Sequence, residues 1–269
     1  MKAAVLRIEG TNCEDEMKVA LDSVNIETEI IHLKQVTGDC NEKLRRDIFD
    51  YDVIMLPGGW SAGDYVRAGA IFAARMKSKL RPKFEEYVKD GRLLGGICNG
   101  FQVLVEFGIL PGLNGISPKP EAVLTNNSNS RFQCRPAYLK HISRCAFTGK
   151  MPKGAIIQVP VAHAEGRLTF GLKEKEYVKI LEENGQIVFK YCKDDGSEAD
   201  GTFPWNPNGS VSDIAGICNP DGNVLGMMPH PERVISSIQQ ADWTRKDYKT
   251  GDGRAFFESI AEYLKKRGR

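Results

Sequence analysis

Apolar and polar positions in the first part of the chain alternate between patterns typical of short strands and patterns typical of helices. Strand-like apolar runs cover residues 3–8, 26–33, 53–56 and 92–97. Helical patterns cover residues 14–24, around 42–48, around 65–90 and 99–107. Thr11 or Asn12 is placed to cap the first of these helices. This order predicts an α/β fold with a mostly parallel, doubly wound sheet flanked by helices.

The pattern changes after about residue 120, where short strand-like segments replace the regular alternation. These segments cover residues 121–125, 131–142, 155–162 and 186–192. Residues 213–218 and 223–228 have the pattern of a hairpin around Pro220-Asp221-Gly222, and a helical pattern follows at 254–266. The second half therefore predicts an antiparallel β elaboration. No linker-like stretch is present, so we interpret residues 1–269 as one domain.

A cysteine occupies the turn between the predicted strand 92–97 and the helix that follows it. Gly96 and Gly100 flank Cys98 in a G-x-C-x-G array, the cysteine counterpart of a serine nucleophile elbow. Glycines tolerate the sharp turn, and the N-terminus of a helix favours a thiolate. The alternative is a small core cysteine after a buried strand, which is the commoner role of this residue. Sites gather at the carboxyl ends of parallel strands, so Pro57-Gly58-Gly59 should converge with Cys98.

A second segment, His230-Pro231-Glu232, supplies the base that a thiol nucleophile needs. Proline favours an extended backbone, in which residues i and i+2 lie on the same side. Glu232 is therefore placed to orient the ring of His230. His230 lies 132 positions after Cys98, so only the fold can bring the two side chains together.

The combination of G-x-C-x-G-x-Q with a distant P-H-P-E resembles the class I (triad) glutamine amidotransferase family. Further matching runs lie at residues 10–14, 56–65, 129–135, 163–167, 206–210 and 214–217. They extend the likeness over nearly the whole chain. Within the family, the chain most resembles the glutaminase subunits of phosphoribosylformylglycinamidine synthase.

This resemblance implies a role for each matching residue. Cys98 would attack the carboxamide of glutamine, His230 would transfer protons, and Glu232 would orient the imidazole. The backbone N–H groups of Gly59 and Asn99 would form the oxyanion hole. The residues expected to bind the substrate are Gln102, Asn129, Arg131 and Phe132.

The resemblance also implies partners. The chain lacks a G-x-x-x-x-G-K-[ST] loop and a G-x-G-x-x-G fingerprint, so we expect it to bind no nucleotide or other cofactor, and no metal. It would pass ammonia from L-glutamine to a large synthetase subunit that holds ATP and Mg²⁺, with a small bridging subunit completing the complex. That complex would convert formylglycinamide ribonucleotide to formylglycinamidine ribonucleotide in de novo purine biosynthesis.

Two alternatives to this function are a non-catalytic scaffold that docks to a synthetase and a class I amidotransferase with a different acceptor. Loss of Cys98, His230 or Glu232 would favour the scaffold, and all three residues are present. In this family the partner usually completes the site, so we expect the isolated chain to be a poor glutaminase.

Composition and charge narrow the class of protein. The 269 residues carry a net charge of +2, which gives no reason to expect a nucleic-acid partner. Seven cysteines without a C-x-x-C pair or a secreted disulfide rhythm indicate a reducing cytoplasm and argue against a structural zinc site. No apolar run approaches the roughly 20 residues of a membrane span, so we expect no membrane association. We expect His163 to be structural or to contact a partner, and Cys13 and Cys134 to pack in the interior.

Overall fold

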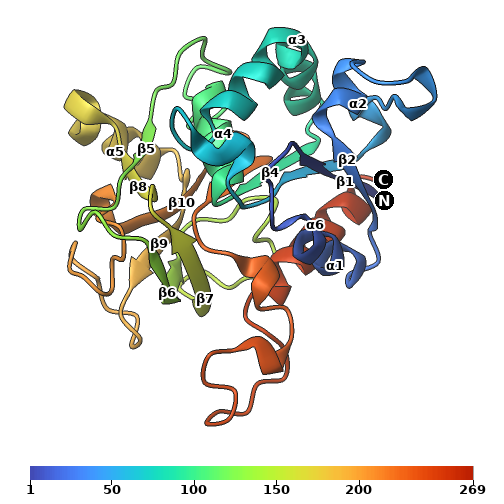
Figure 1. Cartoon of the computed structure of the whole chain (residues 1–269). Helices are drawn as coiled ribbons and strands as arrows, with labels where there is room; N and C mark the ends of the chain where they lie inside the picture. The colour runs from blue at the N-terminus through green and yellow to red at the C-terminus, as the bar shows by residue number, and fades with distance from the viewer. Residues whose placement is uncertain (269) are drawn as a thin grey trace.

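Within residues 1–268, which the computed structural model describes, nine strands form one mixed sheet and two form a small separate sheet (Figure 1). The order in the large sheet is β2-β1-β3-β4-β11-β10-β9-β6-β7. The strands are β1 (Lys2–Arg7), β2 (Glu27–His32), β3 (Val53–Leu56), β4 (Leu93–Ile97), β5 (Val123–Thr125), β6 (Gln133–His141), β7 (Ile156–His163), β8 (Arg167–Thr169), β9 (Ile187–Cys192), β10 (Ile214–Cys218) and β11 (Val224–Met227). The helices are α1 (Glu14–Asp22), α2 (Leu33–Thr37), α3 (Ala70–Lys89), α4 (Asn99–Phe107), α5 (Glu174–Glu183) and α6 (Arg254–Lys266).

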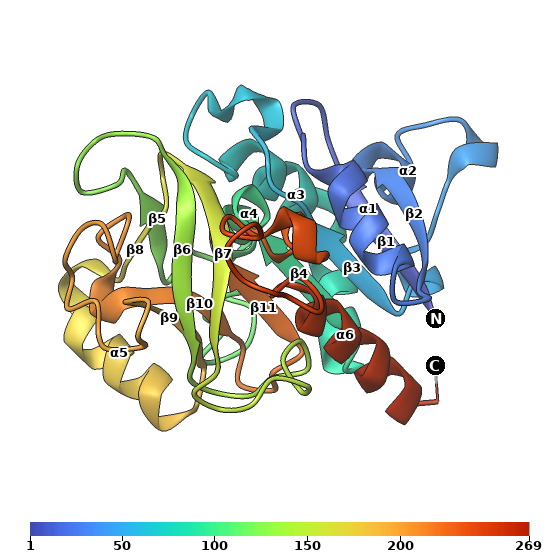
Figure 2. The same ribbon diagram turned by 90° about the horizontal axis from the view of Figure 1, so that it is seen from below.

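One half of the large sheet is parallel. β1 pairs in parallel with β2 and β3, β3 with β4, and β4 with β11. Every residue of β3 and β4 is buried, because helices cover both faces of this half. Figure 2 shows α1 and α6 together on one face, while α3 and α4 pack on the other. The predicted α/β class, with a parallel sheet flanked by helices, is confirmed.

The other half of the sheet is antiparallel, as the change of pattern after residue 120 predicted. β10, β9, β6 and β7 continue the sheet with antiparallel pairings, and β5 pairs with β8 beside it. The predicted hairpin is β10–β11, and β11 also inserts beside β4. The register pairs Met227 with Ile97, and the Cys98 N–H donates to the Met227 carbonyl at 2.8 Å. This pairing carries the segment after β11 to the end of β4.

Several predicted helix boundaries differ from the structure. α3 begins at Ala70 and not near residue 65, because a 3₁₀ turn with left-handed residues, Ser61–Asp64, precedes it. In place of the helix predicted around 42–48, the chain forms two short 3₁₀ turns, Glu42–Leu44 and Ile48–Asp50. α1 has no side-chain cap from Thr11, whose hydroxyl accepts from the Ile8 N–H at 3.3 Å.

The sequence patterns did not indicate α2, α5 or β8. α2 has five residues and β8 has three, so neither spans two full periods of its pattern. α5 buries only Leu181, which leaves it without a continuous apolar stripe. Tertiary contacts define these elements more than local periodicity does.

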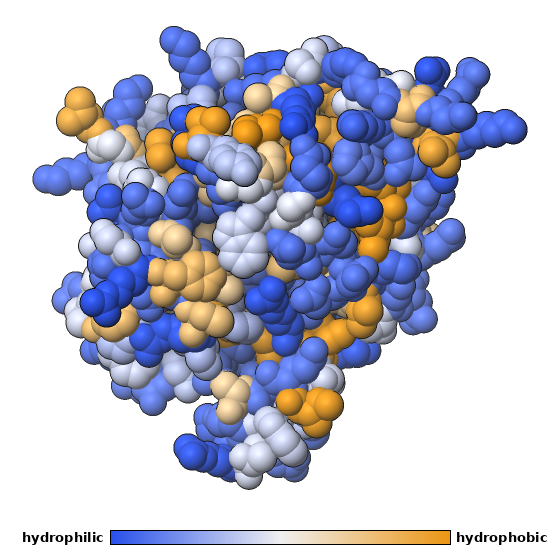
Figure 3. All heavy atoms as spheres, viewed as in Figure 1, coloured by the Kyte–Doolittle hydropathy of each residue, from blue (hydrophilic) through white to orange (hydrophobic). Residues whose placement is uncertain are grey.

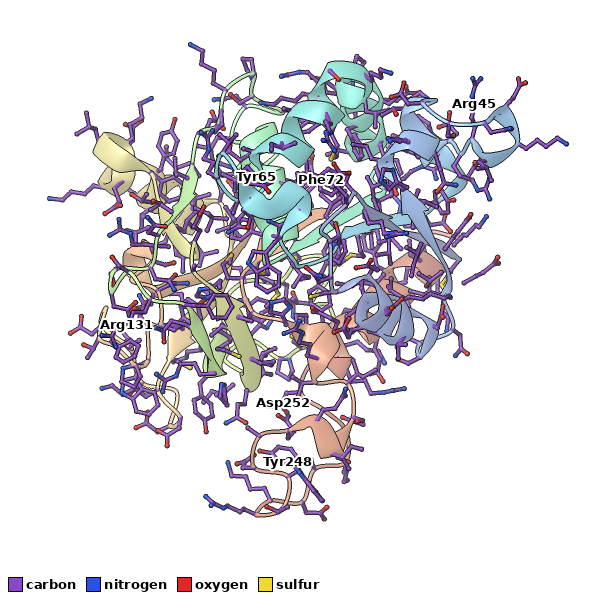
Figure 4. The ribbon with its side chains drawn as sticks, in the orientation of Figure 1. Arg45, Tyr65, Phe72, Arg131, Tyr248 and Asp252 are labelled. Carbon is purple, nitrogen blue, oxygen red and sulfur yellow. The ribbon has the colours of Figure 1, made fainter. Side chains whose placement is uncertain are left out.

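The loop between β11 and α6 projects from the body of the molecule, and Tyr248 and Asp252 lie on it (Figures 1 and 4). Asp252 Oδ2 accepts from the Gln158 N–H at 2.7 Å, which ties the base of the loop to β7. The face seen in Figure 3 is largely hydrophilic, with apolar side chains gathered in separate patches. Across residues 1–268, none of the helices combines the length and the apolar character that crossing a bilayer requires.

Candidate active site

The turn between β4 and α4 holds Cys98 in a strained backbone conformation, with φ 52° and ψ −108°. Its neighbours must be small. A Cβ atom on Gly96 would lie 2.5 Å from the Gly100 carbonyl oxygen, and one on Gly100 would collide with the Leu56 carbonyl of β3. Cys98 is 5% exposed, and its thiol donates to the Ala162 carbonyl at 3.5 Å. The glycines therefore allow α4 to start directly against the sheet, with the sulfur at the helix N-terminus.

His230 and Glu232 lie beside this turn. His230 Nδ1 and Glu232 Oε1 are 2.6 Å apart, and each residue is 1% exposed. The backbone N–H of His230 donates to the Pro160 carbonyl at 2.9 Å, which attaches this segment to β7. A Cβ atom on Gly58 would lie 2.6 Å from His230 Cε1 and 3.4 Å from Cys98 Cβ. Gly58 thus packs between the imidazole and the cysteine, and the fold gathers all three predicted residues of the triad.

The charges around His230 favour its protonated form. Burial by itself lowers the pKa of His230, but the negative charges of Glu232 and of a Cys98 thiolate outweigh this and raise it well above 6.5. Because Nδ1 faces Glu232, the ring presents Nε2 to other groups. Nε2 is buried and has no hydrogen-bond partner among residues 1–268. A buried polar atom without a hydrogen-bond partner is suited to bind a substrate or an ion.

The Pro57-Gly58-Gly59 turn follows β3 and faces Cys98, as expected. The Gly58 carbonyl accepts from the N–H groups of Asn12, at 3.3 Å, and Cys13, at 3.2 Å. In a trans peptide the next N–H points the opposite way, so the Gly59 N–H is directed away from these two residues. Gly59 has φ 140°, and a Cβ atom there would lie 2.6 Å from Asn12 N, so only glycine fits.

Asn99 and Gln102 form a buried network at the start of α4. Asn99 Nδ2 donates to Gln102 Oε1 at 2.9 Å and to Asp64 Oδ1 at 3.3 Å, while its Oδ1 accepts from the Ser61 N–H at 3.2 Å. Gln102 Nε2 donates to the Glu165 carbonyl at 2.7 Å. Burial, together with the charge of Glu165, raises the pKa of Asp64 to about 6. The hydrogen bonds with Asn99 and Glu165 hold the Gln102 side chain in place before any substrate arrives.

The other predicted substrate-binding residues lie on the loop before β6. Asn129 and Arg131 are exposed, and Figure 4 shows Arg131 at the left edge of the molecule. The Phe132 ring stacks on Trp60 with 6.2 Å between centroids. Since Trp60 follows Gly59, this stack joins the predicted substrate loop to the predicted oxyanion turn.

Asn127 organises that loop, and the sequence patterns did not indicate it. Its Nδ2 donates to the carbonyls of Arg131, at 2.8 Å, and His163, at 2.9 Å. Its Oδ1 accepts from the Gly166 N–H at 3.1 Å. Asn127 is 1% exposed. The run of polar residues after β5 was the one sequence feature that could have indicated Asn127, and it does not tell which asparagine of the run is buried.

His163 lies in the same network as a buried, neutral side chain. Its Nδ1 is 3.1 Å from Asn127 Oδ1, so Nδ1 carries the proton and donates. Nε2 is left to accept from Asn208 Nδ2 at 3.5 Å. Burial lowers the pKa of His163 to about 4, and the charge of His230 acts in the same direction. This arrangement agrees with a structural role and leaves no proton-accepting site open.

Comparison with known proteins identifies the family to which this chain belongs. A profile described as "CobB/CobQ-like glutamine amidotransferase domain" matches residues 1–264. The phosphoribosylformylglycinamidine synthase subunit PurQ of Archaeoglobus fulgidus is 50% identical over 99% of this chain and 98% of its own. The PurQ subunit of Picrophilus torridus is 42% identical over 96% and 97%. The chain belongs to the PurQ family of glutamine amidotransferases.

Solved structures agree with this membership. A chain of the PurLQS structure from Thermotoga maritima matches with a TM-score of 0.72 and 30% identity, covering 98% of both chains. The glutaminase domain of CTPS from Trypanosoma brucei, with bound acivicin, matches with a TM-score of 0.56 over 99% of this chain and 94% of its own. At 12% identity that second likeness shows a shared fold. The resemblance stated from sequence motifs is confirmed.

Of the two cysteines expected to pack in the interior of this PurQ-family chain, Cys13 is buried and Cys134 is not. Cys134 on β6 is exposed, because it occupies an outward-facing position of the strand. Cys13 is buried, but it lies in the candidate active site. Arg233 Nη2 donates to Cys13 Sγ at 3.0 Å, and a Cβ atom on Gly58 would lie 3.2 Å from that sulfur. The matching run at residues 10–14 pointed to this segment without indicating its position beside His230.

Proposed function

We propose that the chain is the glutaminase subunit of a phosphoribosylformylglycinamidine synthase. It hydrolyses glutamine to glutamate and ammonia with Cys98, His230 and Glu232. The observation that carries this proposal is the buried His230–Glu232 pair next to a cysteine on a strained strand-to-helix turn. Membership of the PurQ family supports the choice of substrate and pathway.

The first chemical step is attack of the Cys98 thiolate on the carboxamide carbon of glutamine. Negative charge then develops on the amide oxygen. The N–H groups of Gly59 and Asn99 stabilise it, and each such donor contributes about 3–4 kcal/mol in comparable sites. The Gly59 N–H faces away from the loop that binds the Gly58 carbonyl, which leaves it available for the oxyanion.

The second step is departure of ammonia. His230 is protonated because Glu232 and the thiolate stabilise its positive charge, so it can deliver a proton to the leaving nitrogen. The neutral imidazole then takes a proton from water, which hydrolyses the thioester and releases glutamate. Glu232 keeps Nδ1 bound throughout, so that Nε2 performs both proton transfers.

Glutamine is held by residues around this centre. Gln102 is buried at the start of α4, and Asn129, Arg131 and Phe132 lie on the loop before β6. We propose that backbone groups of this loop bind the amino-acid end of glutamine, with Gln102 supporting the opposite wall. The Trp60–Phe132 stack holds the loop before β6 next to the Pro57-Gly58-Gly59 turn.

The partners follow from the reaction. Ammonia passes to a large synthetase subunit, which binds ATP and Mg²⁺ and converts formylglycinamide ribonucleotide to formylglycinamidine ribonucleotide. A small bridging subunit completes the complex. This chain itself uses no cofactor and acts in the cytoplasm. The similarity to a chain of the PurLQS structure from Thermotoga maritima supports an assembly of this kind.

The proposal is tested by labelling with a glutamine-mimicking chloroketone, followed by mass spectrometry, with and without the synthetase partners. We expect one adduct on Cys98, blocked by glutamine and absent in Cys98→Ala. Cys192→Ala is a matched control, because this buried thiol lies on β9, outside the site. In the complex, Cys98→Ala should abolish synthesis from glutamine and retain synthesis from added ammonia. An unlabelled Cys98 under all these conditions would favour the scaffold alternative.

A further inference from the structure

The side chain of Asn99 joins the nucleophile turn to the turn after β3. Its Oδ1 accepts from the Ser61 N–H at 3.2 Å, across 38 positions of the chain. Asn99 is 0% exposed and Ser61 is 2% exposed, so the bond is shielded from bulk water. Ser61 follows Gly59 by two residues, and Asn99 directly follows Cys98. The bond therefore connects the two segments that carry the proposed oxyanion donors.

The other partners of Asn99 fix the orientation of its amide. Nδ2 donates to Gln102 Oε1 at 2.9 Å and to Asp64 Oδ1 at 3.3 Å. Gln102 presents its oxygen to Asn99 because its own Nε2 donates to the Glu165 carbonyl at 2.7 Å. Two acceptors thus require the NH₂ group of Asn99 on their side. The remaining oxygen is directed at the Ser61 N–H before any substrate arrives.

The segment after β1 holds the turn after β3 from its other side. Thr11 and Gly59 form an antiparallel bridge, with backbone hydrogen bonds on either side of the pair. One of these runs from the Trp60 N–H to the Gly10 carbonyl at 3.0 Å. In a bridge of this type the N–H of the paired residue points away from the partner segment. The bridge therefore sets the direction of the Gly59 N–H, and the bond from Asn99 sets the distance of the turn from α4.

We propose that Asn99 is a positioning residue, whose side chain holds the Gly59 N–H at the distance from the Asn99 N–H that one oxyanion requires. This inference rests on the proposed function, since it concerns the charge that develops when Cys98 attacks glutamine. Attack on the amide and later hydrolysis of the thioester each place negative charge on the same oxygen. Donors stabilise that charge only if they are held at hydrogen-bond distance from it. Loss of the bond to Ser61 should therefore slow both steps.

Two variants remove this hydrogen bond from opposite ends. Asn99→Ala deletes the acceptor, and Ser61→Pro deletes the donor. Proline suits position 61, because this residue begins the 3₁₀ turn Ser61–Asp64. In the complex with the synthetase, each variant should lower kcat for glutamate release by about tenfold or more, and the loss of an oxyanion donor itself costs roughly 10²- to 10³-fold. Synthesis from added ammonia should stay unchanged.

The double variant shows whether the two residues act through one bond. Its kcat should lie close to that of the more impaired single variant, because the second change removes a partner that is already without its bond. Losses that multiply in full would show that Asn99 and Ser61 act independently, and would overturn the inference. If Asn99→Ala does not fold, the kcat of Ser61→Pro is decisive, and a value equal to that of the parent refutes the positioning role.

Asn223→Ala is the matched control for the loss of a buried asparagine. Asn223 Nδ2 donates to the carbonyls of Val88, at 2.8 Å, and Arg92, at 2.9 Å, and the residue is 2% exposed. It precedes β11, at the end of the β4–β11 pair that lies away from Cys98. This variant should lose stability and keep the parent kcat. An equal loss of kcat in Asn223→Ala would show that any buried amide has this effect, and would contradict the inference.

A reversible aldehyde analogue of glutamine separates positioning from a general loss of structure. Addition of Cys98 forms an S–C bond, and the carbonyl electron pair moves to the oxygen, which takes the place of the oxyanion. In Ser61→Pro its inhibition constant should rise by about tenfold, as expected for a ligand that resembles the transition state. The inhibition constant of glutamate, which forms no such bond, should change by less than about twofold. Equal rises for the two ligands would refute the positioning role.

The parent distinguishes failure of this inference from failure of the proposed function. A parent that binds the aldehyde and releases glutamate, with variants that behave as the parent does, would overturn only the role of Asn99. A parent that forms neither the aldehyde adduct nor the chloroketone adduct on Cys98 would overturn the proposed function and this inference with it.

Discussion

At the scale of single residues, the candidate site depends on charges and hydrogen bonds that are shielded from water. His230 and His163 are both buried, yet their pKa values move in opposite directions. Glu232 and the thiolate of Cys98 surround the first, whereas Asn127 and Asn208 surround the second with neutral groups. Partners, and not burial alone, therefore decide which histidine can transfer protons.

Glu232→Gln should lower glutaminase activity by roughly 10³- to 10⁴-fold, the size of effect seen when a triad carboxylate becomes an amide. Without the carboxylate charge the pKa of His230 falls, because burial lowers it and the charge of Glu232 no longer opposes that effect. Nitrogen NMR of the imidazole checks this directly. Glu176→Gln, on the exposed surface of α5, is the control and should change neither result. An unaltered His230 signal in Glu232→Gln would exclude this electrostatic account.

His163 should make the fold sensitive to acid. Its pKa is about 4 in the folded chain and near 6.5 when unfolded, so below about pH 6.5 only the unfolded chain binds the proton. Stability is therefore lost as pH falls from about 6.5 to about 4, by about 3 kcal/mol in total. Urea unfolding of the parent and of His163→Asn across this range measures the effect. The variant should show a loss smaller by that amount, and equal pH dependence would contradict the assignment.

At the scale of elements, close contact between α4 and β3 sets the position of Cys98. α4 starts against the Leu56 carbonyl because residue 100 has no side chain. β11 approaches from the other side and binds the Cys98 N–H through Met227. The nucleophile is thus positioned by two strands and one helix at the carboxyl edge of the sheet, where α/β proteins place their sites.

Gly100→Ala should move α4 away from β3 and displace Cys98. We expect a loss of about 1–3 kcal/mol of unfolding free energy, as for other overpacked cores, together with a lower kcat. Gly149→Ala is the matched control, because a Cβ atom at that exposed position meets nothing within 4 Å. Its stability should change by less than about 0.5 kcal/mol. Chemical denaturation compares the two variants. Equal unfolding free energies would show that α4 and β3 accommodate the added methyl group without a loss of stability.

At the scale of the whole molecule, the candidate site is only partly enclosed by this chain. The catalytic residues are buried, but Trp60 and Phe132 at its rim are 51% and 47% exposed. Half-exposed aromatic side chains beside a site that releases ammonia are suited to contact a partner. The membership of PurQ relatives in a synthase agrees with this arrangement.

The isolated chain should therefore be a poor glutaminase. Adding the synthetase partners with their ligands should raise glutamate release, because the partner closes the rim and completes the site around glutamine. The measurement is glutamate release as a function of protein concentration, with and without partners. High activity of the chain alone, unchanged on dilution, would show that the site is complete without docking.

The sequence by itself determined the local chemistry of this protein. Alternating strand and helix patterns defined the α/β class, and the glycines around Cys98 and the His-Pro-Glu segment defined the candidate triad, because these features depend on residues near each other in the chain. Short elements such as α2 and β8 were not predicted, since their patterns are too brief to recognise. Only the tertiary structure placed β11 beside β4 and brought Cys13 to His230. Strand order and burial arise from pairing between distant segments, and no local periodicity records them.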